Sequence, residues 1–172
     1  MSDTIRFSHI YPDISAEAGV SEILQALLTV IRIWSAFINN PEKIKEHHRL
    51  RIAVKETRYT IELNMRILPE PAAKLTEELK KLQDMLGALH DLDILQQRLQ
   101  DAIKSCEKNR RLKQLEAQRS QILQKIKSLE SLKQTAGEQR QRLYEQCVAL
   151  WQNEQTQTLL QSFRDAIEVL GK

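Results

Sequence analysis

The chain has 172 residues, of which 41% are hydrophobic, 28% charged and 5% aromatic, and its four glycines and four prolines fit a helical protein with few turns. That length allows one domain with a hydrophobic core, and the formal net charge of +3 is too small for a general polyanion-binding protein, so any anion site must come from local arrangement. Two cysteines make no disulfide framework, and without a membrane-spanning run or a signal-peptide pattern we expect a cytoplasmic protein.

The first half of the chain predicts a loose arm followed by two helices. Residues 1–19 show no clear period. Ser21 is a plausible N-cap for a helix that ends near Asn39. Its apolar residues recur every three or four positions: Ile23, Leu24, Leu27, Leu28, Ile31, Trp34 and Ile38. Asn40-Pro41 then predicts the start of a second helix, which ends before the break at Pro69-Glu70-Pro71.

The second half predicts longer helices. Leucines recur in steps of three or four residues along the third helix: Leu75, Leu79, Leu82, Leu86, Leu89, Leu92, Leu95 and Leu99. Gly87 lies within it at a cost of about 1 kcal/mol relative to alanine, which suggests close approach of another backbone or of a ligand. After Cys106 a narrow apolar stripe continues on a polar sequence, with Gly137 as the expected turn and a final helix near 159–170. We therefore predict one all-α domain over 1–172, a bundle of about five to six helices with a long antiparallel helical hairpin over 110–170.

The second helix carries a column of basic residues. His48, Arg51, Lys55 and Arg58 fall within an arc of about 80° on a helical wheel. Apolar residues lie opposite the column (Leu50, Ala53, Val54 and Ile61) and beside it (Ile52, Tyr59 and Leu63). This pattern indicates a partly enclosed basic groove in the region 41–107, which suits a polyvalent anion. The alternative is a solvated face of i,i+4 ion pairs, in which Glu62 neutralises part of the column. The lone histidines His9 and His47 are expected to be surface residues.

Two segments resemble a known family. His48-x-x-Arg51-x-x-x-Lys55-x-x-Arg58-Tyr59, followed after the proline-rich break by Leu82-Gln83-Asp84-Met85-Leu86-Gly87-Ala88-Leu89-His90-Asp91, is similar to the motifs of the CHAD family, the conserved-histidine α-helical domain. The resemblance covers about residues 48–99. It implies an all-helical domain with a basic groove that binds inorganic polyphosphate, and with it an association with polyphosphate granules.

The resemblance also implies roles for single residues. By motif position, the contacts to phosphate would come from His48, Arg51, Lys55 and Arg58, from Lys80 or Lys81, and from His90, which stands where the family often has arginine. Tyr59, Gly87 and Asp91 would support them: Gly87 by letting helices approach, and Asp91 by orienting a basic side chain.

Family members generally contain two such motif pairs, whereas this sequence has one. Symmetric self-association would supply the second pair. We therefore predict a homodimer strengthened by the polymer, joined through an apolar seam within residues 112–151 or 23–38.

Three functions compete at this stage. The first is a non-enzymatic polyphosphate-binding module, which needs no cofactor, nucleophile or metal. The second is a metal-dependent phosphohydrolase built on His48, His90, Asp91 and Asp93, although the cations around His48 would repel a metal ion. The third is unspecific RNA binding by the same groove, because the sequence shows neither an aromatic stacking set nor a recognition-helix motif for reading nucleic-acid sequence.

Overall fold

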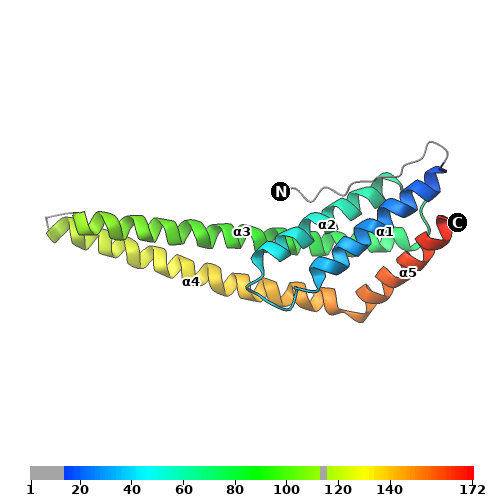
Figure 1. Cartoon of the computed structure of the whole chain (residues 1–172). Helices are drawn as coiled ribbons and strands as arrows, with labels where there is room; N and C mark the ends of the chain where they lie inside the picture. The colour runs from blue at the N-terminus through cyan, green and yellow to red at the C-terminus, as the bar shows by residue number, and fades with distance from the viewer. Residues whose placement is uncertain (1–13, 113–115) are drawn as a thin grey trace. The chain divides into compact units, whose positions relative to one another are not determined.

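The computed structural model describes residues 14–112 and 116–172 (Figure 1). These residues form five α-helices: α1 (Ala16–Ser35), α2 (Ile44–Leu63), α3 (Pro71–Leu112), α4 (Glu116–Gln152) and α5 (Glu154–Leu170). The predicted all-α fold class is confirmed. The chain divides into two compact units, one of Met1–Asp84 with Val148–Lys172 and one of Met85–Cys147.

Helix α1 begins six residues before the position that the sequence suggested. Ser15 is its N-cap, with a hydroxyl that accepts a hydrogen bond from the backbone N–H of Ala18 at 3.2 Å. Ser21, the expected cap, is instead a buried residue within the helix, and its hydroxyl donates to the carbonyl of Ile167 in α5 at 2.5 Å. The expectation that Ser21 is the N-cap is therefore wrong, because its hydroxyl is hydrogen-bonded to α5.

The core of the first unit is built from one face of each of its helices. Helix α1 packs against both α2 and α5. Large aliphatic and aromatic side chains with at most 4% exposure fill this core: Leu24, Leu27, Leu28, Ile31, Leu50, Val54, Ile61, Leu75, Leu79, Leu82, Phe163 and Ile167. Their spacing of three and four residues within each helix is what made these helices predictable.

Three helix ends follow local rules. Pro71 is the first residue of α3, where its missing N–H is not needed. Asn153 separates α4 from α5 and caps α5 by accepting from the N–H of Gln155 at 2.8 Å. Helix α2 begins at Ile44 rather than at Pro41, because the carbonyl of Asn40 accepts from Lys43 in a turn before the helix.

The second unit is an antiparallel hairpin of α3 and α4 (Figure 1). Three contacts fix its register: Arg140 with Asp93, Gly137 with Gln96, and Lys133 with Gln100. In this antiparallel register, moving forward along α3 by a given number of residues moves the opposite position in α4 back by the same number. The same register sets Leu86 level with Cys147, Leu89 with Tyr144 and Glu107 with Ile126.

Gly137 lies in the interior of α4, so the turn expected there is wrong. A Cβ atom at this position would lie 3.5 Å from the Nε2 atom of Gln96 in α3, which is ordinary contact. The hairpin consequently begins well before residue 110. A mid-helix glycine costs about 1 kcal/mol, which a 37-residue helix packed along a partner can absorb.

Candidate anion-binding face of α2

Helix α2 separates its apolar and basic faces as its sequence pattern predicts. Leu50, Ala53, Val54 and Ile61 have at most 2% exposure, which confirms the interior face. The basic column of His48, Arg51, Lys55 and Arg58 follows at steps of three and four residues on another face. The three expected flanking residues, Ile52, Tyr59 and Leu63, are exposed, Leu63 at 89%. They leave the column as an open face and do not wall in a groove.

Arg51 has a guanidinium nitrogen that no described residue satisfies. Its side chain is half-buried, and its Nε atom is shielded from solvent without a hydrogen-bond acceptor among the described residues. Within the same part of the chain, no carboxylate forms an ion pair with it. Buried polar groups in native proteins nearly always have partners, so the Nε atom of Arg51 is an exception within the described part of the chain.

Arg58 is held from three sides. Its Nε atom donates to the side-chain oxygen of Gln83 in α3 at 3.0 Å, and its Nη1 atom pairs with Glu62 one turn further along α2. The guanidinium also lies 4.3 Å from the ring centroid of Tyr59. The ion-pair alternative for the column therefore holds for Arg58, whose charge Glu62 partly neutralises.

Lys55 lies one turn before Tyr59 and is exposed. Its ammonium group is 5.6 Å from the centroid of the Tyr59 ring. The ring of Tyr59 thus contacts two cations of the column, Lys55 and Arg58, and limits where their long side chains can reach. This gives Tyr59 a physical role beside the basic residues.

The two neighbouring histidines of α2 have different surroundings. His48 is half-buried, with its Nδ1 atom shielded from solvent. His47 has 3% exposure and lies 3.4 Å through its Nε2 atom from the carbonyl oxygen of Phe37. The interpretation of His47 as a surface residue is wrong, because it precedes Leu50 and Val54 on the interior face. His9, interpreted in the same way, lies outside the described residues.

Helix α3 offers two candidate lysines in the first unit. Lys80 is exposed and lies three residues before Gln83, on the face of α3 that meets Arg58. Lys81 is bound to Glu78 at 2.6 Å, and this hydrogen bond, with the charge of Glu78, raises the pKa of Lys81. Of the two, Lys80 is the better placed to extend the column. Gln83 belongs to the second motif, but sequence reasoning gave it no role.

Three further candidates belong to the second unit. A Cβ atom at Gly87 would have no heavy atom of the described chain within 4 Å, so α4, its partner in the hairpin, does not approach it closely. His90 is half-buried and Asp91 is exposed. Gly87, His90 and Asp91 follow one another on one face of α3, and their roles toward phosphate remain predictions of the resemblance.

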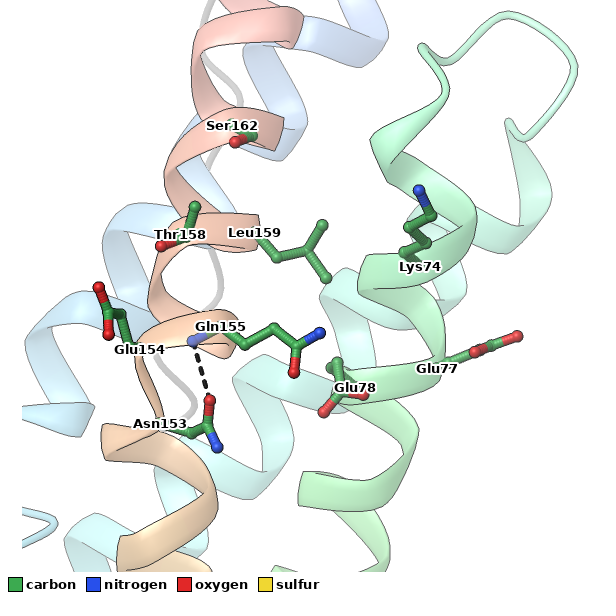
Figure 2. Close-up of a pocket in the computed structure, with 9 residues that line it drawn as sticks. All are labelled: Lys74, Glu77, Glu78, Asn153, Glu154, Gln155, Thr158, Leu159 and Ser162. Carbon is green, nitrogen blue, oxygen red and sulfur yellow. Dashed lines mark hydrogen bonds between the residues drawn. The ribbon is translucent and has the colours of Figure 1, made fainter.

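A cleft of about 690 Å³ between α3 and α5 is a different environment (Figure 2). Gln155 and Leu159 project from α5 toward α3, whereas Glu77 points away from the cleft. Its lining residues include three acidic ones, Glu77, Glu78 and Glu154, and one lysine, Lys74, which is already paired with Glu70 at 3.0 Å. This charge balance does not suit a polyanion.

The residues suggested for a metal site belong to two units, His48 to the first and His90, Asp91 and Asp93 to the second. Across residues 14–112 and 116–172, no three His, Cys, Asp or Glu side chains come together in a group that could hold a metal ion. Asp93 pairs with Arg140 inside the hairpin, and both side chains are at most 11% exposed. Its carboxylate therefore has a structural partner.

The cysteines differ in environment. Cys147 is buried, and burial raises the pKa of its thiol to about 12. Cys106 is half-buried. Helices in the described part of the chain include none that is long and apolar enough to cross a membrane.

Comparison with models of known protein families assigns the chain to one of them. A model of the CHAD domain matches residues 15–100, half of the chain, and spans α1, α2 and most of α3. The chain belongs to the CHAD domain family, as its two motifs predicted. Neither a curated protein nor a solved structure matches it. CHAD domains are linked in general to polyphosphate binding, and the matched region contains the whole basic column.

Proposed function

We propose that this protein is a non-enzymatic binding module for inorganic polyphosphate and that the basic column of α2 contacts the polymer. The observation that carries the proposal is Arg51, a half-buried guanidinium whose shielded Nε atom has no acceptor within the described chain. A phosphate oxygen would supply that acceptor, and the planar fork of arginine can bind two phosphate oxygens at once.

The neighbouring residues support a polymeric ligand. The column places a cation at nearly every turn of α2, about 5 Å apart along the helix axis. Lys55 is exposed and takes part in no ion pair within the described residues. Arg58 is positioned by Gln83, and Lys80 shares the face of Gln83 on α3. A chain of linked phosphates meets such a row repeatedly, whereas a single phosphate meets one or two of its members.

The critical experiment compares Arg51→Gln with Arg49→Gln. Both changes remove one positive charge from α2, two residues apart. Arg49 is exposed on another face, where its guanidinium lies 4.6 Å from the Trp34 ring. We expect Arg51→Gln to weaken binding of long-chain polyphosphate about ten- to a hundredfold, since a charged hydrogen bond contributes about 1.5–3 kcal/mol. Arg49→Gln should retain nearly the affinity of the unmodified protein.

The measurement is isothermal titration calorimetry at several salt concentrations, with circular dichroism to confirm that helicity is unchanged. Binding through the column should weaken steeply with salt, because bound cations release counterions from the polymer. Equal losses in the two variants would reduce the effect to net charge and contradict the proposed site. Titrations with pyrophosphate and RNA complete the test: equal affinity for RNA would show a general polyanion surface.

A further inference from the structure

The α3–α4 hairpin of the second unit has two sides with different chemistry. In α3, the residues that face α4 follow a heptad pattern of alternating three- and four-residue steps: Leu86, Leu89, Asp93, Gln96, Gln100, Ile103 and Glu107. Its apolar members are buried, but its centre is polar and is held by hydrogen bonds to α4. The polar centre of the contact between α3 and α4 therefore fixes the register of the two helices, and apolar surface is buried mainly by Leu86, Leu89 and Ile103.

A second heptad series precedes the first by one residue throughout. All seven of its members in α3 are apolar: Met85, Ala88, Leu92, Leu95, Leu99, Ala102 and Cys106. None of the seven is buried, and Leu95 retains 43% exposure. One step back along a helix is a rotation of about 100°, so this series forms one flank of the hairpin.

The equivalent series of α4 lies on the same flank, because one step back in two antiparallel helices turns both toward the same side of the pair. It consists of Lys125, Leu129, Leu132, Ala136, Gln139, Leu143 and Gln146; four of these seven are apolar, and of the four Ala136 is buried. Leu132 is 58% exposed, and the single charged member lies at one end. We call the two series together the apolar flank.

The opposite flank is polar, which shows that the apolar flank is not a general property of the hairpin. The residues that follow each facing position in α3 are Gly87, His90, Ile94, Gln97, Asp101, Lys104 and Lys108. In α4 they include Lys127, Glu138 and Glu145. The hairpin is therefore amphipathic across its width, and the motif residues Gly87 and His90 belong to its polar side.

We propose that the apolar flank is the surface on which a second copy of this chain docks, so that two hairpins close into a four-helix bundle. From Met85 to Cys106 the flank is about 32 Å long, and two helices side by side make it about 20 Å wide. Its area of about 600 Å² approaches the roughly 800 Å² per partner that stable interfaces bury.

A second copy is the occupant that fits this flank best. The near absence of charge argues against a nucleic acid, a polyphosphate chain or a charged peptide as the partner. An identical flank has the same length, the same heptad spacing and the same lack of charge. Two such flanks can meet about a two-fold axis, which gives a closed assembly in which each flank covers the other. This inference does not rest on polyphosphate binding.

Two adjacent leucine-sized residues provide the test. Leu95 belongs to the apolar flank and Ile94 to the polar one, yet their exposures are 43% and 42%. The full chain and the variants Leu95→Glu, Leu132→Glu and Ile94→Glu are compared by sedimentation velocity over a wide concentration range, without polyphosphate. We expect a dimer for the full chain and for Ile94→Glu, and a monomer for Leu95→Glu and Leu132→Glu.

Circular dichroism keeps the comparison interpretable, because all three substituted side chains are exposed and helicity should be preserved. A full chain that remains monomeric at the highest concentration would overturn the proposal and assign the flank to a different apolar partner. A dimer that persists in both Leu95→Glu and Leu132→Glu would place the interface elsewhere and overturn it as well. Polyphosphate binding, measured separately, can succeed or fail independently of either result.

Discussion

The ion pair between Asp93 and Arg140 provides a quantitative test of how the hairpin is held together. The two side chains are 8% and 11% exposed, so both charges are largely removed from water. Removing one member leaves the other as a buried charge without its main counter-ion. We expect Arg140→Leu to lower the free energy of unfolding by about 3 kcal/mol, the lower end of the range for broken buried pairs, because some exposure remains.

The double substitution should behave differently. Replacing both members by leucine removes both desolvation costs and adds apolar contact at the same level of the hairpin. We expect the Asp93→Leu/Arg140→Leu variant to be about as stable as the unmodified protein, or up to a few kcal/mol more stable. A double-mutant cycle in urea, followed by circular dichroism, measures both changes and the coupling between them. For a chain of this size, the loss in Arg140→Leu should lower Tm by roughly 6–12 °C. A loss below about 1 kcal/mol would mean that the pair acts as an exposed surface pair, and the reasoning would be refuted.

Two further predictions concern single positions. Gly87→Ala should raise the free energy of unfolding by up to about 1 kcal/mol in urea titrations, because alanine favours the helix and a Cβ atom there would meet open space; a clear loss of stability would contradict this. At pH 8, Ellman's reagent should react with Cys147 only after unfolding, because burial raises the pKa of Cys147 to about 12; labelling of Cys147 in native buffer at the rate seen in the unfolded protein would disprove it.

The fold class was predictable because the core uses simple periodicities. Leucines at steps of three and four identified α3, and the interior face of α2 follows from Leu50, Val54 and Ile61. Boundaries were less predictable where a residue has two plausible roles. Ser15 and Ser21 are both good caps in isolation, and only the contact of Ser21 with the carbonyl of Ile167 distinguishes them.

Errors at two further positions have related causes. His47 was assigned to the surface by residue type, although its spacing from Leu50 and Val54 already placed it on the interior face. Gly137 was read as a turn because glycine weakens helices, but its local cost is small beside the packing of two long helices. In both cases tertiary contact outweighed the preference of a single residue.

The position of the basic column on α2 was predictable from the sequence, but which of its side chains has a partner was not. The sequence places four cations on one face of α2, and it also places Glu62 within reach of Arg58. Which cation is neutralised and which is left unsatisfied depends on α3, because Gln83 fixes Arg58 while Arg51 has no acceptor within the described chain. The basic residues of the column therefore differ in how far their charges are already compensated: Arg58 is paired with Glu62, and Arg51 has no ion pair within the described chain. If the proposed function is right, an anion should gain most at Arg51, where no ion pair within the described residues has to be broken, and less at Arg58, where it must compete with Glu62.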